Sequence, residues 1–257
     1  MVTSLANERV KYARSLHRER ARTREKRFLI EGTRAVQEAL RAGVRPVLAF
    51  YTARLSATSQ GAALLAQLKH AAECLMEVSP QVMASLSDTV APQGVLAVVP
   101  IPDLPWPAHG LVVVLDSLRD PGNAGTILRT AWAAGAAGLA TGKGTVDPFA
   151  PKVVRAAMGA HFYLPIRAGL DRPELAALLS GRRLILADQA GTPYWHLDWQ
   201  GDIALIIGGE ARGAELTEGF AQVRAAIPMA QEAESLNAAI AAAVLLFEAA
   251  RQRTTAA

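Results

Sequence analysis

The stretch that decides the fold runs from residue 111 to residue 125 and reads LVVVLDSLRDPGNAG. Its first part, Leu111–Leu115, is an almost unbroken apolar run, as expected for a strand buried on both faces of a parallel sheet. A turn signal follows in Pro121-Gly122-Asn123, and the residues after it predict a helix over about 124–136. A buried strand that leads through a loop into a helix indicates an α/β domain with a polar loop at the carboxyl end of the strand.

Two further strand ends carry polar side chains or bare backbone. Gly208-Gly209-Glu210 directly follows the strand predicted at 204–207, and Ile227-Pro228-Met229, with Ser235-Leu236-Asn237 after it, follows the strand predicted at 225–227. Ligands of α/β proteins bind at such strand ends, because loops and helix N-termini there expose unpaired N–H and C=O groups. Three ends of this kind in one domain predict a single composite pocket.

The rest of the second half alternates between strands and helices. Further short strands are predicted near 138–140, 163–166 and 184–187, and helices near 151–159, 172–179 and 236–251. This pattern predicts a mostly parallel α/β sheet. The last helix is apolar on most of its faces, so it should be buried in the domain or against a second subunit.

The first half predicts a small α/β/α domain of its own. It should hold helices at about 5–24, 34–42, 61–72 and 80–86 and strands at about 28–30, 47–51, 75–78 and 95–99. Residues 100–107 contain four prolines, which exclude a helix or a central strand and indicate an interdomain linker. We therefore expect a first domain over 1–100, a linker over 101–109 and a second domain over 110–257.

The positive charge of the chain is concentrated near its start. Between Arg9 and Arg27 lie nine Arg or Lys residues and two acids, in a chain whose net charge is +4. Such a basic block on a nearly neutral body favours a polyanion partner over the alternative, a solvated helix face. A nucleic-acid partner predicts affinity that falls steeply with salt. The candidate RNA-binding residues are Arg9, Lys11, Arg18, Arg22, Arg24 and Arg27.

Several classes of function are disfavoured. Cys74 is the only cysteine, so no intrachain disulfide can form, and a reducing, cytoplasmic location is expected. No secretory signal is evident, and the most apolar segment, 236–247, is too short to span a bilayer, so no membrane partner is expected. The five histidines show no metal spacing, so no metal is expected. The glycine fingerprints of P-loop and dinucleotide-binding proteins and the nucleophile elbow are missing.

Taken singly, each polar residue also has a purely structural interpretation. Asn123 and Ser235 are good helix N-caps, and Glu210 could be an ordinary charge at the rim of the sheet. Arg129 could be a surface charge, although its place nearly two helical turns after Asn123 predicts that both project near the same side. Asp116 and Asp120 are more typical of turn chemistry than of an acid/base pair.

Together and in order, these motifs resemble the SpoU (TrmH-type) RNA ribose 2′-O-methyltransferases of the SPOUT superfamily, over residues 108 to 254. The residues that carry the resemblance are Asn123 with Arg129, Gly208-x-Glu210-x-x-Gly213, Ile227-Pro228-Met229 with Ser235-Leu236-Asn237, and a middle segment with Asp147-Pro148-Phe149, 151–155 and Gly159. Phe28-Leu29-Ile30-Glu31-Gly32 after a basic helix resembles the ribosomal-protein-like substrate-binding domain that is often fused to these enzymes.

The resemblance implies a C-terminal α/β trefoil knot, S-adenosylmethionine as cofactor, a homodimer and an RNA substrate, rRNA being favoured over tRNA. It implies a catalytic set of Arg129, Asn123, Glu210, Ser235 and Asn237, and cofactor-binding residues Thr141, Gly142, Ile207, Gly208, Gly209, Ile227, Met229 and Leu236. Gln231 and Ala157 depart from the family pattern, which often has Gly and Ser there. The target nucleotide, a role in antibiotic resistance and the group that accepts the proton stay open.

Alternative functions are a non-catalytic RNA-binding protein of the same fold, a tRNA 2′-O-methyltransferase, a base-methylating relative and an unrelated nucleotide-binding enzyme. The intact catalytic set argues against the non-catalytic protein. Base methylation usually needs a carboxylate, and no carboxylate replaces the set around Arg129. For ribose methylation we expect Arg129 to grip a phosphate and to stabilise the developing alkoxide, because a guanidinium does not normally lose its proton.

Overall fold

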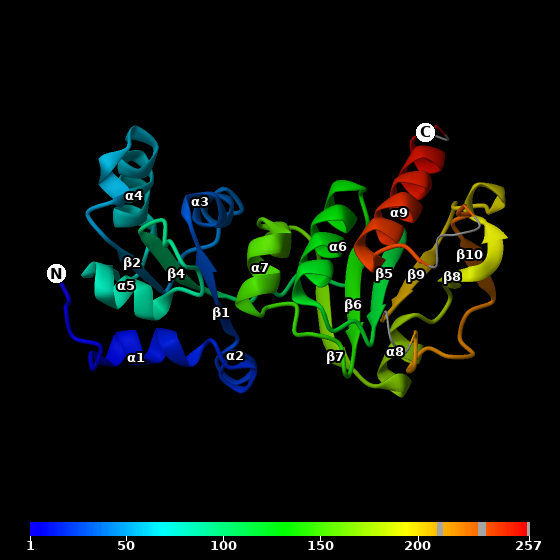
Figure 1. Ribbon diagram of the computed structural model, residues 1–257, viewed down its shortest axis with the longest axis horizontal. Helices are drawn as coiled ribbons and strands as arrows, with labels where there is room; N and C mark the ends of the chain where they lie inside the picture. Colours follow the sequence, from blue (N-terminus) through cyan, green and yellow to red (C-terminus); the bar gives the residue numbers. More distant parts are fainter. Residues whose placement is uncertain (210–212, 231–234, 256–257) are drawn as a thin grey trace. The chain divides into compact units, whose positions relative to one another are not determined.

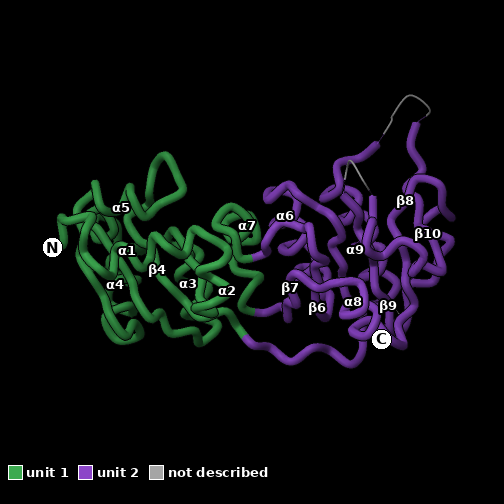
Figure 2. Tube along the Cα trace, turned by 90° about the horizontal axis from the view of Figure 1, so that it is seen from below, with its two compact units in different colours: residues 1–102, 149–162 green, residues 103–148, 163–257 purple. Residues whose placement is uncertain are grey.

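The computed structural model describes residues 1–209, 213–230 and 235–255. By its internal contacts the chain forms two compact units, coloured separately in Figure 2. Unit 1 comprises residues 1–102 and 149–162, and unit 2 comprises residues 103–148 and 163–257. No helix in the described ranges is both long and apolar enough to cross a membrane.

Unit 1 is built on a mixed four-stranded sheet in the order β1-β4-β2-β3. The β2–β3 pair is parallel, and the pairs β1–β4 and β2–β4 are antiparallel. The elements in chain order are α1 (Glu8–Ser15), α2 (Glu19–Glu25), β1 (Arg27–Glu31), α3 (Thr33–Arg41), β2 (Leu48–Tyr51), η1 (Leu55–Ala57), α4 (Ser59–Ala71), β3 (Leu75–Glu77), α5 (Pro80–Leu86) and β4 (Val95–Pro100). The predicted α/β architecture and the predicted strands of this region are confirmed.

The long basic helix expected over 5–24 is wrong, because the chain breaks into α1 and α2. Leu16 lies in the break, and its side chain is fully buried in the core beside Val10 and Ala13. The guanidinium of Arg22 donates to the carbonyl oxygens of Leu16 and His17, at 2.8 and 2.9 Å. These carbonyls would otherwise be left without helical partners where α1 ends.

Arg22 is therefore a structural residue. Only 4% of its surface is exposed. A guanidinium that is buried against backbone carbonyls cannot also bind an RNA phosphate, so the assignment of Arg22 to the RNA-binding set is corrected. The other five candidates are more accessible: Arg9, Lys11, Arg18 and Arg24 are exposed, and Arg27 is half-buried.

A segment from the middle of the chain completes unit 1. Residues 149–162, which the sequence placed in the second domain, contain α7 (Pro151–Ala157) and η2 (Ala160–Phe162) and belong to unit 1. The rings of Phe149, His161 and Phe162 surround Phe28 of β1, with centroid distances of 5.2, 5.6 and 6.0 Å. An aromatic cluster thus fixes the segment to the sheet of unit 1.

Unit 2 is an all-parallel six-stranded sheet in the order β10-β8-β9-β5-β6-β7. Its elements are β5 (Leu111–Asp116), α6 (Pro121–Ala133), β6 (Gly138–Gly142), β7 (Ile166–Leu170), α8 (Arg172–Leu178), β8 (Arg183–Pro193), η3 (Tyr194–His196), β9 (Ile203–Gly208), β10 (Val223–Ala226) and α9 (Ala238–Thr255). Leu175 and Leu179 pack on one face against Val112, Val114 and Ile206. Helices α6 and α9 lie side by side on the other face (Figure 1).

Two elements of unit 2 differ from their predicted bounds. The strand expected at 184–187 is the much longer β8, and the strand expected at 163–166 is β7 at Ile166–Leu170. Helix α6 begins before the predicted residue 124, because Asp120 rather than Asn123 is its N-cap: the Asp120 carboxylate accepts from the Asn123 N–H at 2.7 Å.

Asp116 anchors the loop that follows β9. Its side chain is fully buried and accepts hydrogen bonds from the Thr217 N–H and hydroxyl, both at 2.8 Å, and from the Ser117 hydroxyl at 3.0 Å. The two acids that the sequence left as turn residues are thus structural, since Asp120 caps a helix and Asp116 holds a distant loop.

Replacing Asp116 with Ala should lower the free energy of unfolding of unit 2 by about 3 kcal/mol, because buried donors of Thr217 and Ser117 lose a charged acceptor. Asp120→Ala should cost only about 1 kcal/mol, as for an ordinary N-cap. All four tryptophans (106, 132, 195 and 199) lie in unit 2, so their fluorescence during urea unfolding reports this unit. Equal losses in the two variants would contradict the anchoring role of Asp116.

Replacing Arg22 with Ala should destabilise unit 1 by about 2 kcal/mol, since one buried and one partly buried carbonyl lose a charged donor. Arg20→Ala, which removes an exposed arginine from the same helix, should change the free energy by less than about 0.5 kcal/mol. Amide hydrogen exchange of peptides that cover 8–31 measures both. Unchanged protection in Arg22→Ala would show that the guanidinium does not hold the α1–α2 corner.

Candidate active site

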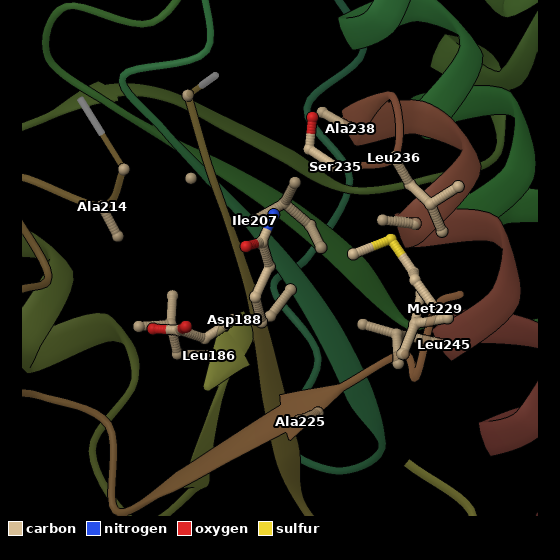
Figure 3. A pocket seen from close by; sticks show the side chains of 17 residues that line it. Leu186, Asp188, Ile207, Ala214, Ala225, Met229, Ser235, Leu236, Ala238 and Leu245 are labelled. Carbon is tan, nitrogen blue, oxygen red and sulfur yellow. The ribbon is translucent and has the colours of Figure 1, made fainter. Parts of the chain in front are cut away.

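One cavity of about 380 Å³ opens in unit 2, where β8, β9 and β10 meet the start of α9 (Figure 3). It is lined by Leu186, Ala187, Asp188, Gln189, Ile207, Gly208, Gly209, Gly213, Ala214, Ala225, Ile227, Met229, Ser235, Leu236, Ala238, Ala241 and Leu245. The lining is mostly aliphatic side chain and glycine backbone. This is the composition of a small-molecule site, in which a few polar groups set the orientation of the ligand.

The glycines beside the cavity are required by close packing of the backbone. A Cβ on Gly209 would lie 2.2 Å from the carbonyl oxygen of Ser117, and a Cβ on Gly208 would lie 2.6 Å from the carbonyl carbon of Gly213. Gly209 and Gly213 also exchange two backbone hydrogen bonds of 2.9 Å. The glycine motif thus lets the loop after β9 close on itself and on the loop after β5.

A pair of asparagines joins two helix N-termini near the cavity. The Asn237 Nδ2 donates to the Asn123 Oδ1 at 3.0 Å. The Asn237 Oδ1 accepts from the N–H groups of Ala239 and Ile240, at 2.9 and 3.3 Å, and so caps α9. Asn237 therefore fills the capping role that the sequence offered to Ser235, whose side chain lines the cavity instead. The sequence placed Asn123 and Asn237 in one site, and the structure brings them into contact.

Arg129 does not lie beside this pair within the chain. Both Asn123 and Arg129 belong to α6. Six helical residues advance the chain by about 9 Å and turn it to a face about 120° away. The expectation that the two residues project near the same side was therefore wrong. Arg129 is exposed, and within the described part of the chain its side chain makes no hydrogen bond or ion pair. Glu210, the remaining member of the expected catalytic set, lies outside the described residues, as does Gln231.

Most of the expected cofactor-binding residues line the cavity: Ile207, Gly208, Gly209, Ile227, Met229 and Leu236. Thr141 and Gly142 do not. The buried Thr141 hydroxyl accepts from the Gly169 N–H at 3.0 Å, and Leu216 closes over Gly142, where a Cβ would lie 2.7 Å from its Cδ1. These two residues pack β6 against β7 and the loop that contains Leu216.

Strand β8 provides a side of the cavity that the sequence motifs did not predict. Leu186, Ala187, Asp188 and Gln189 all line it. Asp188 and Gln189 directly follow the apolar run at 184–187, so the rule that found the other strand ends could have found them too.

Ala157, the other departure from the family pattern, is fully buried in α7, where it forms part of the packing of unit 1.

The five remaining candidate RNA-binding residues differ in their availability. Lys11 pairs with Glu8 and Arg24 with Glu25, each at 2.8 Å on the surface, where such pairs exchange readily for other partners.

Arg9 donates to the Cys74 Sγ at 2.9 Å. Arg27 donates to the Tyr12 hydroxyl at 3.0 Å, and this hydrogen bond holds the pKa of Arg27 above its ordinary value. Lys11, Arg18 and Arg24 are therefore the most accessible candidates for phosphate contacts.

Within the described ranges, no cluster of three or more His, Cys, Asp or Glu side chains could hold a metal ion.

Comparisons with known proteins agree with this architecture. Residues 110–247 match the family described as "SpoU rRNA Methylase family", and residues 7–97 match the "MRM3-like substrate binding domain". The chain is 33% identical to the 23S rRNA (guanosine(2553)-2′-O)-methyltransferase RlmP of Bacillus subtilis, over 96% of this chain and 97% of that protein.

Solved structures are similar over almost the whole chain. An AdoMet-bound rRNA methyltransferase from Sinorhizobium meliloti is 33% identical, with a TM-score of 0.84 and 97% of each chain covered. The SpoU methyltransferase AviRb from Streptomyces viridochromogenes, in complex with AdoMet, is 29% identical with a TM-score of 0.86, over 97% of this chain and 99% of that one.

The resemblance stated from the motifs is thus confirmed, and with it the expected fold class and the expected cofactor, S-adenosylmethionine. The chain belongs to the SpoU rRNA methylase family and carries an MRM3-like substrate-binding domain at its N-terminal end.

Proposed function

We propose that this protein transfers the methyl group of S-adenosylmethionine to a ribose 2′-hydroxyl of ribosomal RNA. The observation that carries the proposal is the cavity beside residues 186–189 of β8 and the ends of β9 and β10, with Ser235 in its wall and with the Asn123–Asn237 pair at the N-termini of the adjoining helices. Family membership over residues 110–247 and the substrate-binding match over 7–97 support both the reaction and the rRNA substrate.

The cavity suits the cofactor in size and in chemistry. A volume of about 380 Å³ falls within the range of small-molecule sites. Ile227, Met229 and Leu236 offer apolar contacts for a flat base, and Gly208 and Gly209 add backbone to the wall of the cavity. When bound, the cofactor would supply a methyl group on a sulfonium: the ribose oxygen would bond to the methyl carbon while the carbon–sulfur bond breaks and the sulfur leaves as a neutral thioether.

The protein must orient the ribose hydroxyl and stabilise the negative charge that develops on its oxygen. We assign the first task to Ser235, Asn123 and Asn237, whose side chains can donate and accept hydrogen bonds. We assign the second to Arg129, because a guanidinium stays protonated and can hold both a phosphate and a developing alkoxide. Glu210 belongs to the same proposed set.

The orientation of Arg129 favours a homodimer with shared sites. On its own chain Arg129 is turned away from Asn123. The neighbouring helix α9 exposes Ile240 and Phe247, each at 53%, and seven residues apart they lie on one face. A second copy packed on α6 and α9 would bury this apolar face and carry Arg129 into the transfer site of its partner. A two-fold axis would create two such sites.

RNA is proposed to bind to the exposed basic residues Arg9, Lys11, Arg18 and Arg24, with Arg27 beside them. Contacts of this kind recognise phosphates and local shape rather than bases, as is usual for structured RNA. The substrate-binding match over 7–97 favours rRNA over tRNA, and it also favours an enzyme over a non-catalytic RNA-binding protein. The proposed location is the cytoplasm, where the free thiol of Cys74 would remain reduced.

Replacing Arg129 with Ala should lower kcat about 100- to 1000-fold, the usual effect of removing one donor to a developing oxyanion. The affinity for S-adenosylmethionine, measured by calorimetry, should stay unchanged. Transfer is measured with labelled cofactor on rRNA, with alkali-resistant dinucleotides as the signature of 2′-O-methylation. Wild-type turnover of Arg129→Ala would remove this residue from the mechanism.

The same variant tests the shared site. Arg129→Ala and Asn237→Ala chains, each inactive alone, are unfolded together and refolded in equal amounts. If Arg129 acts across a two-fold axis, each mixed dimer regains one intact site and the mixture recovers about a quarter of wild-type activity. If each chain forms its own site, mixing restores nothing, and the shared-site proposal fails while the reaction itself is untouched.

Replacing Arg18 and Arg24 together with Ala should weaken RNA binding uniformly across sequences. The slope of log affinity against log salt should become less negative by about 2, one for each lost phosphate contact. Arg41→Ala, which removes an exposed arginine of α3 outside the basic block, is the matched control and should leave the slope unchanged. Equal slopes for the wild type and the double variant would exclude these residues from the RNA-binding surface.

A further inference from the structure

The β8 side of the cavity is shaped by a jump in strand register. Arg224 of β10 pairs with Leu186 of β8, but the next residue, Ala225, pairs with Thr192. The register therefore skips residues 187–191, which form an outsized bulge at this edge of the cavity. Bulges of this kind re-aim side chains and are frequent beside active sites. Here the bulge brings Asp188 and Gln189 into the cavity wall.

Two neighbouring groups of the protein hold the carboxylate of Asp188 in place. One oxygen accepts from the Ala190 N–H at 2.9 Å, and the other is paired with the Arg224 guanidinium. A carboxylate has about four acceptor positions, so both oxygens keep capacity for a ligand. Among the described residues that line the cavity, Asp188 is the one with a carboxyl side chain.

The cavity is thus polar at one end and apolar at the other. Met229, Leu236 and Leu245 lie together on one side of Ile207, and Asp188 lies on the other side (Figure 3). An adenosine has the same division, since its base offers flat faces and its ribose offers two neighbouring hydroxyl donors. Two adjacent hydroxyls match the two oxygens of one carboxylate.

We propose that Asp188 binds the ribose of S-adenosylmethionine by accepting hydrogen bonds from its hydroxyls, and that Arg224 is the positioning residue that holds the carboxylate in the required orientation. This inference rests on the proposed function and names a specificity-determining contact within it. The ribose is favoured over the ammonium group of the methionine part because Arg224 already neutralises Asp188. A second cation beside that guanidinium would be repelled, whereas a neutral diol would not.

The test compares 5′-methylthioadenosine, which lacks the amino-acid part, with its 2′-deoxy counterpart, by calorimetry on the full-length protein. The wild type should bind the 2′-deoxy compound about 10- to 100-fold more weakly, the usual effect of losing a hydrogen bond to a charged group. Asp188→Ala should bind the two compounds with nearly equal affinity, and the isosteric Asp188→Asn should fall between. Asp103→Asn, the same change at an exposed carboxylate of unit 2, should discriminate as the wild type does.

Arg224→Gln should reduce the preference for 5′-methylthioadenosine over its 2′-deoxy counterpart. Because Arg224 acts through the carboxylate, adding Arg224→Gln to Asp188→Ala should not change that preference further. If Arg224 had only a structural role, Arg224→Gln would lower the affinity for both compounds equally. The proposal is overturned if Asp188→Ala still prefers the ribose compound as strongly as the wild type. It is also overturned if Asp188→Ala weakens S-adenosylmethionine but not 5′-methylthioadenosine, which would place the carboxylate on the ammonium group. A wild type that binds no S-adenosylmethionine would instead contradict the proposed function.

Discussion

The side chain of Asn237 joins the two helices that cover one face of the C-terminal sheet. Its carbonyl oxygen caps α9, which leaves its amide N–H free to donate to Asn123 near the N-terminus of α6. One short side chain thus sets the start of a helix and its distance from a second helix. The cavity lies against that start, with Ser235 and Leu236 on one side of Asn237 in sequence and Ala238 on the other. Its shape therefore depends on where α9 begins.

The loops that face the cavity are held by contacts that leave no space for larger residues. Gly209 packs directly on the carbonyl of Ser117, and Gly208 packs on Gly213. Beneath them, Asp116 at the end of β5 binds Thr217 in the segment that follows the glycine loop. A buried carboxylate whose two oxygens both accept hydrogen bonds fixes the loop without filling the cavity. The result is a rigid wall of backbone beside a space that is largely apolar.

The N-terminal unit divides its basic residues between structure and surface. Arg22 is used inside the α1–α2 corner, where two carbonyls accept from its guanidinium. Arg18 and Arg24, on either side of it in sequence, remain exposed. A count of charges cannot separate these roles, because burial depends on the corner between the two helices. The corner in turn depends on Leu16, which is drawn into a core formed with α5 and the sheet.

The sequence by itself determined the features that arise within a few residues. The apolar run 111–115 determined a buried parallel strand, and the ordered motifs determined the family. Only the tertiary structure decided which distant residues meet. It paired Asn123 with Asn237 across 114 residues, placed 149–162 in unit 1 and brought Asp188 into the cavity. The physical reason is range: strand and helix periods report local burial, whereas side-chain partners depend on strand order, register and helix rotation, which form only when the whole sheet assembles.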